Sequence, residues 1–434
     1  MKRKDTIYAL STPTGKSAIA VIRVSGTNAF KIIKNLSTNM PTIPNKSLVN
    51  KIYTKKNGEV DQTITTFYKK PKSYTGEDMV EISIHGGSLV IKKLINILGN
   101  HKNCRLAEPG EFTKRAFENG KLDLTQVEAI ADLINSETEA QHKQAINQLK
   151  GKLTTLTKGW KENIMKILAN IEAIIDFADE DLPDNVLIQS KEHIVNIIKE
   201  ISNELDSFDL GEKIRSGFIV AILGKTNAGK SSFINNLAKR DIAIVTDEPG
   251  TTRDVIELFI DFNGLPIKFY DTAGIRKSTS KAEKIGVNKS LELAKNSDIN
   301  LIFIDKLREI NSYESFNNKI FVKSKIDIIN YDKKKPNLHY ISSKTSEGIS
   351  DLLNFIINHL VKDKNTNDVS VSRERHRKIL ENTLKHLKNS TENKDIDVFA
   401  EDIRLSLKEI EKITGNVDIE DILDIVFRDF CIGK

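Results

Sequence analysis

The sequence lacks the features that extracellular and membrane-embedded proteins depend on. Its 434 residues include only two cysteines, Cys104 and Cys431, which cannot build a disulfide framework. No apolar run approaches the roughly 18 residues that a helix needs to cross a bilayer. The start, MKRKDTIYALSTPTGK, lacks an apolar stretch of signal-peptide length. We therefore expect a cytoplasmic protein with no membrane segment.

Composition and charge are those of soluble globular domains. The chain is 39% hydrophobic and 29% charged, and its length exceeds that of one ordinary domain. The formal net charge of +6 is compatible with a polyanionic partner but does not require one. The basic runs KKPK (69–72) and DKKKP (332–336) are interpreted as solvated surface, because the whole chain is rich in lysine.

Hydropathy patterning divides the chain into four parts. Residues 1–118 contain short β-rich runs that end in glycine turns, and residues 119–215 place apolar residues at helical spacing. Residues 216–363 alternate apolar strands with helical stretches, and residues 369–434 are helical again. We predict a multidomain α/β plus all-α protein. A doubly wound α/β domain is inserted into a helical domain, and an α/β N-terminal domain precedes both.

A phosphate-binding motif opens the third part. Residues 224–231, GKTNAGKS, match G-x-x-x-x-G-K-[ST] between an apolar strand and a helix. Glycines let backbone N–H groups turn toward phosphate oxygens, and the helix presents its positive end. In this motif Lys230 reaches the β- and γ-phosphates, and Ser231 offers its hydroxyl to Mg²⁺.

Two further motifs place groups around the γ-phosphate. YDTAG (270–274) ends a second apolar strand, so Asp271 can hold the Mg²⁺ shell and the Gly274 N–H can meet the γ-phosphate. GTTRD (250–254) lies between the two motifs, where a switch loop supplies a threonine to the metal.

The later motifs indicate which base is bound. SKID (324–327) and SSK (342–344) follow later strands. The Asp327 carboxylate can accept the N1–H and amino group of guanine, a pair of donors that adenine lacks, so GTP is favoured. Ser324 stands where GTPases normally carry asparagine, and we expect weaker affinity with guanine selectivity kept. The segment 306–318 is short, which predicts a truncated helix.

A catalytic group found in Ras-like enzymes is missing. The position after DTAG, where those enzymes orient water with glutamine, is Ile275. Either hydrolysis is slow or another group acts. Asn227, with carbonyls of the loop 244–252, could cage a monovalent cation such as K⁺ and so supply the charge of an arginine finger. The alternative is that Asn227 is present for its turn propensity.

Several stretches together resemble one family. The chain is similar to the tRNA modification GTPases MnmE, also called TrmE, along nearly its whole length. The phosphate loop is common to many proteins, whereas the PGEFTKRAF block and the CIGK segment are far more specific. The stretches are DTIYALSTPTGKSAIAVIRVSG, SYTGEDMVEISIHGG, LAEPGEFTKRAFENGKLDLTQVEAIADLI, GKTNAGKSS, AIVTDEPGTTRDVIE, DTAGIRKSTSKAEKIG and FCIGK.

This resemblance implies an architecture and a reaction. It implies a folate-binding N-terminal domain, a split helical domain and a K⁺-dependent P-loop GTPase domain. It also implies a homodimer built through the N-terminal domains and a heterotetramer with an FAD-dependent MnmG-type partner. Together they would add an aminomethyl-type (carboxymethylaminomethyl) group at C5 of the wobble uridine of certain tRNAs. The carbon would come from a reduced folate, 5-formyl- or methylene-tetrahydrofolate.

The resemblance also assigns residues at the nucleotide. Asn227, Thr246, Glu248 through its backbone and Thr251 would hold K⁺, and Ser231 and Thr252 would hold Mg²⁺. Glu283 would be catalytic, organising the water network in place of the missing glutamine. The motifs and the resemblance together assign to GTP the residues Asn227, Ala228, Gly229, Lys230, Ser231, Ser232, Thr246, Asp247, Glu248, Pro249, Gly250, Thr251, Thr252, Asp271, Thr272, Ala273, Gly274, Ser324, Lys325, Ile326, Asp327, Ser342, Ser343 and Lys344.

A folate site follows from the same resemblance. It would bring the C-terminal motif back to the N-terminal domain, with Cys431 catalytic and Lys434 beside Arg23, Glu81 and Lys121. A carboxylate such as Glu81 can read the amino and N–H edge of a pterin, and the cationic residues can neutralise the glutamate tail of folate. The alternative for Cys431 is a small apolar residue that closes a helical bundle.

Two rival functions differ in what they require. A ribosome-assembly or RNA-binding GTPase would carry an RNA-binding domain or a second GTPase domain. The sequence shows neither a second phosphate loop nor a GXXG loop in a suitable context. A folate-binding aminomethyl carrier or transferase would use the GTPase domain only for regulation, and both activities can coexist in one chain.

Overall fold

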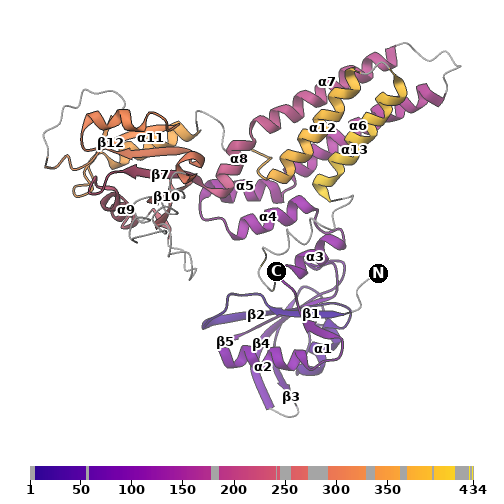
Figure 1. Ribbon diagram of the computed structural model, residues 1–434. Helices are drawn as coiled ribbons and strands as arrows, with labels where there is room; N and C mark the ends of the chain where they lie inside the picture. Colours follow the sequence, from indigo (N-terminus) through magenta and orange to yellow (C-terminus); the bar gives the residue numbers. More distant parts are fainter. Residues whose placement is uncertain are drawn as a thin grey trace, which may run out of the picture. The chain divides into compact units, whose positions relative to one another are not determined.

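The computed structural model describes residues 5–54, 58–176, 185–240, 242–244, 256–271, 292–328, 338–361, 369–392, 395–415, 430 and 433 (Figure 1). These residues belong to two units. The first unit comprises Met1–Ala131, Thr154–Lys161 and Lys408–Lys434, and the second comprises Asp132–Leu153 and Glu162–Leu407. Each unit is described by itself.

A six-stranded sheet organises the first unit. Its order is β3-β4-β5-β2-β1-β6, and every pairing is antiparallel except the parallel pair β1–β6. Two helices, α1 (Ala29–Leu36) and α2 (Ser88–Gly99), share one apolar core with the sheet, so both cover the same face (Figure 1). The strands are β1 (Thr6–Leu10), β2 (Ser17–Ser25), β3 (Ser47–Thr54), β4 (Gly58–Tyr68), β5 (Met79–Gly86) and β6 (Cys104–Leu106).

Strand alternation separates the two faces of this sheet. Ile22 and Val24 of β2 and Ile82 of β5 are fully buried beneath the helices. Because successive side chains point to opposite faces, Arg23 and Glu81 lie on the face that α1 and α2 leave uncovered. The apolar–polar alternation of the sequence therefore determines which residues remain available for chemistry.

A buried ion network ties the helix α3 (Glu111–Glu118) to this sheet. The Arg115 guanidinium is 2.9 Å from Glu111 and 3.1 Å from both Glu77 and Asp5, and Arg105 approaches Glu111 to 2.6 Å. The side chains of Glu111 and Arg115 are 1% and 2% exposed. Burial by itself raises the pKa of Glu111, but hydrogen bonds from Arg105, the Glu108 N–H and Arg115 lower it to about 2.

This pKa predicts acid sensitivity of the first unit. A carboxyl whose pKa is lowered by folding stabilises the protein above its ordinary value of 4.5, and that stability is lost as the pH falls toward 2. The shift corresponds to a loss on the order of 3 kcal/mol in the free energy of unfolding. Denaturant titrations between pH 6 and pH 2.5, followed by fluorescence of the buried Trp160, will measure it. Glu111→Gln should have a lower free energy of unfolding at pH 6, and that free energy should change less with pH than it does in wild type. The same pH dependence in the two proteins would contradict the prediction.

Helices that precede the inserted domain pack against helices that follow it. Helices α7 and α12 pack against each other, and Arg404 of α13 pairs with Glu172 of α6. The ammonium of Lys191 in α7 lies 5.9 Å from the ring centre of Phe399 in α13. The prediction of one helical domain split by an insertion is therefore confirmed (Figure 1). The helices of this domain are α4 (Leu124–Ile134), α5 (Glu139–Leu149), α6 (Lys152–Asp176), α7 (Asn185–Asp206), α8 (Phe208–Ser216), α12 (Glu374–Glu392) and α13 (Ile396–Thr414). Residues 124–131 of α4, 154–161 of α6 and 408–414 of α13 belong to the first unit.

The inserted domain is built on a seven-stranded sheet of order β13-β12-β11-β7-β10-β9-β8. Strands β10, β7, β11, β12 and β13 run parallel, whereas β9 is antiparallel to β10 and β8 to β9. The strands are β7 (Phe218–Gly224), β8 (Ala243–Ile244), β9 (Ile256–Phe262), β10 (Leu265–Asp271), β11 (Ile299–Phe303), β12 (Lys319–Lys323) and β13 (Leu338–Tyr340).

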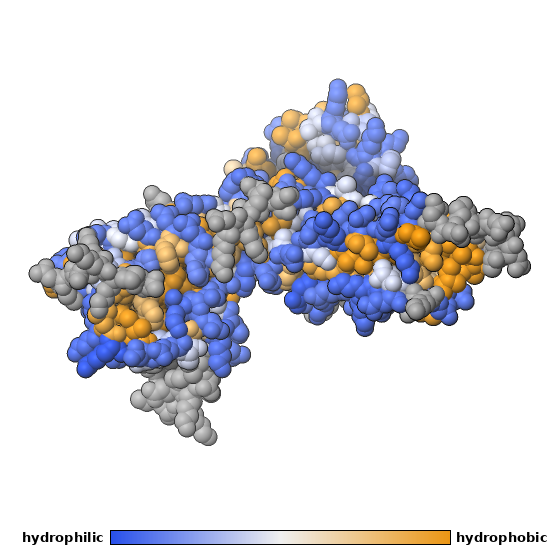
Figure 2. All heavy atoms as spheres, turned by 90° about the horizontal axis from the view of Figure 1, so that it is seen from above, coloured by the Kyte–Doolittle hydropathy of each residue, from blue (hydrophilic) through white to orange (hydrophobic). Residues whose placement is uncertain are grey.

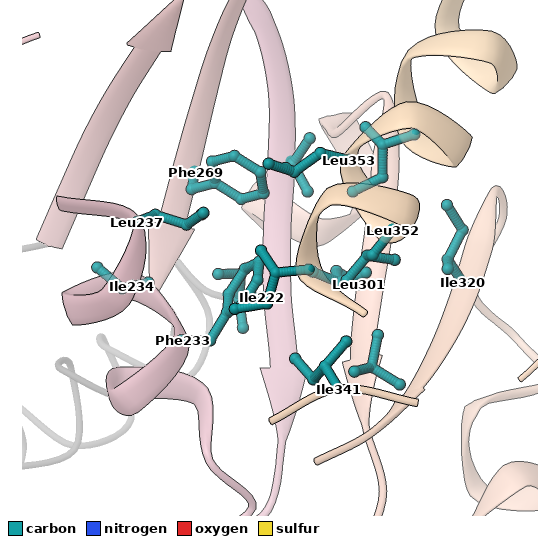
Figure 3. Close-up of a cluster of buried hydrophobic side chains, with 14 of the residues drawn as sticks. Ile222, Phe233, Ile234, Leu237, Phe269, Leu301, Ile320, Ile341, Leu352 and Leu353 are labelled. Carbon is teal, nitrogen blue, oxygen red and sulfur yellow. The ribbon is translucent and has the colours of Figure 1, made fainter. Parts of the chain in front are cut away.

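Apolar side chains cover both faces of this sheet. Helices α9 (Lys230–Ala238) and α11 (Ile349–Val361) pack on one face, where their side chains and those of the strands form one buried cluster that includes Phe233, Ile222 and Leu301 (Figure 3). A second cluster that includes Ile302 lies on the other face. Burial on both faces explains the consecutive apolar residues of these strands and confirms the doubly wound prediction. Residues 307–313 form the short 3₁₀ helix η2 (Leu307–Tyr313), as the truncated segment predicted.

Hydrophilic residues cover much of the face drawn in Figure 2, and the hydrophobic areas on it are interrupted by hydrophilic ones. This agrees with the 29% of charged residues in the sequence. Within the described ranges, no helix combines the length and the apolar character that crossing a membrane requires.

Candidate functional site

The phosphate loop joins β7 to α9. Gly229 adopts φ 95° at the start of the helix, and a Cβ there would lie 2.5 Å from Ser324 Oγ, so only glycine fits without a shift. Lys230 is 4% exposed, and its Nζ donates to the carbonyls of Gly224 at 2.8 Å and Lys225 at 2.6 Å. A lysine held inside a loop at a helix N-terminus is the geometry that binds a phosphate chain.

Two of the residues predicted to hold Mg²⁺ meet beside this loop. Ser231 is the second residue of α9 and Asp271 ends β10, and the serine hydroxyl donates to Asp271 Oδ2 at 3.2 Å. Asp271 is 1% exposed. A hydroxyl and a carboxylate are hard oxygen ligands of the kind that Mg²⁺ prefers, so the two side chains fit that ion.

The predicted base-reading loops lie against the phosphate loop. Ser324 follows β12, and its hydroxyl donates to the Ala228 carbonyl at 2.6 Å. The next residue, Lys325, donates from Nζ to the Asn227 carbonyl at 2.7 Å. Ser342, which follows β13, donates to Asp327 Oδ1 at 2.8 Å and so orients the carboxylate predicted to read guanine.

Ser324 therefore does more than replace asparagine. It is 4% exposed, and its hydroxyl ties the base-reading loop to the backbone of the phosphate loop. The sequence identified Ser324 as part of the site, because it stands three residues before Asp327 in the SKID motif. The bond to Ala228 comes from a residue 96 positions away, which local sequence patterns do not encode.

Sequence reasoning missed a second anchor of the phosphate loop. Glu309 of η2 has a side chain that is 9% exposed, and its Oε1 lies 2.8 Å from Lys225 Nζ. The Asp305 N–H donates to Glu309 Oε2 at 3.2 Å. The hydrogen bond from Lys225 is the main cause that lowers the pKa of Glu309. No motif includes Glu309, so no sequence signal identified it.

Ser324→Ala is predicted to weaken GTP binding without changing base selectivity. It removes the hydrogen-bond donor 2.6 Å from the Ala228 carbonyl, and Ala228 is 1% exposed. Loss of a partner for a buried acceptor costs about 1–3 kcal/mol, or roughly fivefold to a hundredfold in affinity. Titration of a fluorescent GTP analogue, with competition by ATP, will measure both quantities. Ser297→Ala is the matched control, since its hydroxyl also donates to a backbone carbonyl, that of Ala294. Equal affinity of Ser324→Ala and wild type for the GTP analogue would show that the hydrogen bond from Ser324 to Ala228 does not contribute to nucleotide binding.

The other predicted nucleotide residues in the described part of the chain are placed as follows. Ser232 lies in α9, and Ile326 is 8% exposed between Lys325 and Asp327. The Ser343 carbonyl accepts a hydrogen bond from Asn236 at 3.0 Å, and Lys344 donates its N–H to Ser342 Oγ at 3.2 Å. The remaining predicted residues lie outside the described residues: Thr246, Asp247, Glu248, Pro249, Gly250, Thr251, Thr252, Thr272, Ala273, Gly274, Glu283, Cys431 and Lys434.

A second group of polar and aromatic side chains lies on the uncovered face of the six-stranded sheet. Arg23 of β2 and Glu81 of β5 are register partners, and Arg23 donates to Glu81 Oε1 at 2.8–2.9 Å. The Tyr68 hydroxyl donates to Glu81 Oε2 at 3.3 Å. The Arg23 guanidinium carbon lies 5.2 Å from the ring centre of Tyr74 and 5.6 Å from that of Phe112. We call these five residues the Arg23 cluster.

The Arg23 cluster is shielded but accessible. The side chains of Arg23 and Glu81 are 19% and 24% exposed. Burial raises the pKa of Tyr68, and the neighbouring Glu81 carboxylate raises it further. Burial also raises the pKa of Tyr74, whose hydroxyl is 2.8 Å from Thr113 Oγ1. Both phenols therefore stay protonated at neutral pH. A fixed arginine–carboxylate pair against aromatic rings can hold a flat polar ring system.

Lys121, Phe430 and Gly433 belong to the same unit as the Arg23 cluster. The Lys121 Cγ lies 3.4 Å from the position of a Cβ on Gly76, in the turn that carries Tyr74. The Ser11 hydroxyl donates to the Gly433 carbonyl at 3.1 Å, and the neighbouring Leu10 of β1 pairs with β2 next to Arg23. Phe430 is 6% exposed and packs with Val127. Sequence reasoning missed Tyr68, Tyr74 and Phe112, although the SYTGED and PGEF segments contained two of them.

The arrangement of strand ends defines a class. The phosphate loop, Asp271 and the base-reading loops all follow strands of one doubly wound sheet, and parallel strands end at a common edge. The inserted domain is thus a P-loop nucleotide-binding domain with the motif set of GTPases.

Comparison with known proteins identifies the family. Residues 124–431 match the MnmE helical domain, and residues 6–121 match the GTP-binding protein TrmE N-terminus. The tRNA modification GTPase MnmE of Pelagibacter ubique is 44% identical over 99% of this chain and 100% of that protein. That of Orientia tsutsugamushi is 42% identical over 99% of each. The solved G domain of the T. maritima FeoB iron transporter also matches, with 24% identity, a TM-score of 0.26, and coverage of 33% of this chain and 98% of that one. The chain belongs to the MnmE (TrmE) family.

Proposed function

We propose that this protein hydrolyses GTP and uses that cycle to modify the wobble uridine of certain tRNAs at C5. A reduced folate would supply the carbon, and an MnmG-type FAD protein would be the partner. One observation carries the proposal. A chain aligned over 99% of its length with a tRNA modification GTPase contains both a phosphate site and the Arg23 cluster.

At the nucleotide, each described side chain has a defined task. Lys230 would leave its two carbonyl partners to contact the phosphates, and Ser231 with Asp271 would hold Mg²⁺, aided by Thr252. The magnesium ion neutralises charge on the phosphate oxygens when it is bound. Asp327, oriented by Ser342, would accept the guanine donors.

A potassium ion would supply the charge that Ras-like enzymes obtain from arginine. Asn227, Thr246, Glu248 and Thr251 would hold it, and Glu283 would orient the attacking water in place of Ile275. Support for Asn227 comes from its backbone. It has φ 64°, and its carbonyl is held by Lys325 at 2.7 Å, so the residue has a fixed position in the loop.

In the first unit, the Arg23 cluster would bind the folate. Glu81, held by Arg23 and Tyr68, keeps lone pairs with which to accept from a pterin edge. Lys121 and Lys434 would contact the glutamate tail, and Cys431 would lie beside the reacting carbon. The hydrogen bond between Ser11 and Gly433 supports this placement, because it holds Gly433 next to the end of β1.

We also propose that two copies of the chain pair through their N-terminal domains. On the sheet face that carries the Arg23 cluster, Val49 and Ile64 are register partners that are 60% and 48% exposed. Ile19 of β2 lies on the same face and is 61% exposed. Exposed apolar residues on one sheet face favour burial against another protein surface, and a second copy would provide one.

The test is a deletion strain whose tRNA nucleosides are analysed by mass spectrometry. Loss of the modified wobble uridine, restored by the wild-type gene but not by Lys230→Ala, is the expected result. Normal wobble uridine together with a defect in ribosomal subunits would instead identify a ribosome-assembly GTPase. If Lys230→Ala restores the modification fully, GTP hydrolysis is not required for the chemistry and the GTPase domain has only a regulatory role.

A further inference from the structure

A lysine-rich turn adjoins the Arg23 cluster. Residues 69–72, with the sequence KKPK, connect β4 to the loop that precedes β5. We call Lys69, Lys70 and Lys72 the lysine turn. All three side chains are exposed. The sequence alone indicates only solvated surface for this run. In the structure it lies between Tyr68 and Tyr74, two residues of the Arg23 cluster.

Both ends of the lysine turn are anchored in the Arg23 cluster. Tyr68, immediately before the turn, donates to Glu81, and Tyr74, two residues after it, lies under Arg23. Neighbouring Cα atoms are 3.8 Å apart, so Lys69 and Lys72 lie within about 8 Å of one of these tyrosines, Cα to Cα. The backbone of the turn therefore lies beside the place where the proposed chemistry occurs, and three exposed lysine side chains extend from it.

The backbone of the turn is held in one conformation. The Lys72 N–H donates to the Lys69 carbonyl at 2.9 Å, and the Lys70 N–H donates to Asp78 Oδ1 at 3.0 Å. The Ser73 hydroxyl donates to the Glu77 carbonyl at 2.5 Å. A turn fixed by these bonds presents its side chains at a defined position and loses little backbone freedom when a partner binds.

The charge of the turn is not neutralised locally. Within the described residues, none of the three ammonium groups has a carboxylate at ion-pair distance. The nearest acidic residues in the chain are committed elsewhere. Glu77 pairs with Arg115 at 3.1 Å and accepts from Ser25 at 2.9 Å, and Asp78 accepts from the backbone of Lys70. The carboxylates of β4 lie toward its other end, where Glu59 pairs with Lys51 and Asp61 with His85.

We propose that the lysine turn binds the phosphate backbone of the RNA whose base is presented to the Arg23 cluster. This inference rests on the proposed function, which brings a tRNA uridine to a carbon donor held by that cluster. A base can reach the cluster only with its flanking phosphates close to the rim, and cations there hold the backbone without reading its sequence. The turn would position the RNA, and the cluster would act on the base.

The test compares two triple variants of the full-length protein. Lys69→Ala/Lys70→Ala/Lys72→Ala removes the lysine turn. The matched control, Lys31→Ala/Lys34→Ala/Lys92→Ala, removes three exposed lysines from α1 and α2, on the opposite face of the same sheet (Figure 1). The probe is an unmodified tRNA transcript with uridine at the wobble position, and its affinity is measured by fluorescence anisotropy between 50 and 300 mM KCl.

The expected result concerns both affinity and salt dependence. Each lost phosphate contact should reduce the slope of log affinity against log salt by about 0.7–0.9. Taking wild type and variant to converge near 1 M salt, each lost contact weakens binding at 0.1 M salt by roughly fivefold to eightfold. The alanine triple should therefore bind roughly fivefold less tightly if one lysine contacts phosphate, and more than a hundredfold less tightly if all three do. Its slope should be shallower, and the control triple should match wild type. Substitution of the same lysines by arginine keeps the charge and should keep both the affinity and the slope.

Other outcomes overturn the inference. An equal loss of tRNA affinity in the two alanine triples would show only an effect of net charge. Wild-type tRNA affinity in the lysine-turn variant would show that these residues are ordinary solvated surface.

Weaker binding of a polyglutamyl folate by the lysine-turn variant, with unchanged tRNA affinity, would show that the turn binds the folate tail instead. If wild type modifies tRNA in cells and the lysine-turn variant binds it normally, only this inference fails. If the deletion strain keeps its modified uridine, the proposed function itself fails.

Discussion

Steady-state GTP hydrolysis is expected to fall roughly tenfold to a thousandfold when K⁺ is replaced by Na⁺ at equal ionic strength. Ile275 cannot orient water, so the transition state depends on charge supplied by other groups. Loss of one preorganised electrostatic contact typically costs about a hundredfold to a thousandfold in kcat. Na⁺ is smaller than K⁺ and fits a K⁺-sized cage poorly. Equal rates in the two salts would contradict a cation held beside the phosphate loop.

Asn227 is the residue with which to test that cage. Because it has φ 64°, alanine would add backbone strain to the loss of the side chain. Asn227→Gly removes the same amide at a position where glycine is unstrained, so it is the cleaner variant. It should lose the K⁺ response and retain most of its GTP affinity, measured by hydrolysis at saturating GTP and by nucleotide titration. Thr226→Ala, in the adjacent exposed position, is the control that should keep the K⁺ response.

Removal of residues 431–434 is expected to abolish wobble-uridine modification and leave GTP hydrolysis intact. Phe430 is 6% exposed, and Ser11 donates to the Gly433 carbonyl at 3.1 Å, so Phe430 and Gly433 are held within the first unit. The phosphate site lies in the other unit and does not depend on these contacts. The measurements are folate affinity by calorimetry, GTP turnover, and modified nucleoside from cells that express the truncated chain.

Gly433→Ala is a finer probe of the same segment. Gly433 has φ 101°, and a Cβ there would lie 2.2 Å from the Leu10 carbonyl oxygen, so alanine forces the segment away from β1. We expect this variant to bind folate less tightly, as the truncation does. Cys431→Ser separates the thiol from the packing, because it keeps the size of the side chain. Normal folate binding and modification by the truncated protein would exclude Cys431 and Lys434 from the site.

The nucleotide site was largely predictable from sequence because its parts are local. Residues 224–231 form one contiguous loop between a strand and a helix, and the bonds from Lys230 to Gly224 and Lys225 close it on itself. Asp271 and Asp327 were found because Asp271 ends one apolar strand and Asp327 follows another, and the parallel strands of the sheet have their carboxyl ends at one edge. Alternating strand and helix texture also indicated the inserted domain.

Contacts between distant residues could not be predicted in the same way. The tether from Ser324 to Ala228 and the pair of Glu309 with Lys225 join residues 96 and 84 positions apart. Both depend on the approach of loops that local propensity does not specify. The expectation of weaker GTP affinity from Ser324 therefore described this residue incompletely, since its hydroxyl also bonds to the Ala228 carbonyl.

The sequence by itself determined the phosphate loop, the doubly wound and helical textures and, through its alternation, the faces of each strand. Only the tertiary structure decided that Arg23 meets Glu81, 58 positions away, and that Tyr68 and Tyr74 flank this pair with the lysine turn between them. The physical reason is register. A shift of one residue between β2 and β5 would send Glu81 to the buried face, and long-range packing beneath α1 and α2 selects the register.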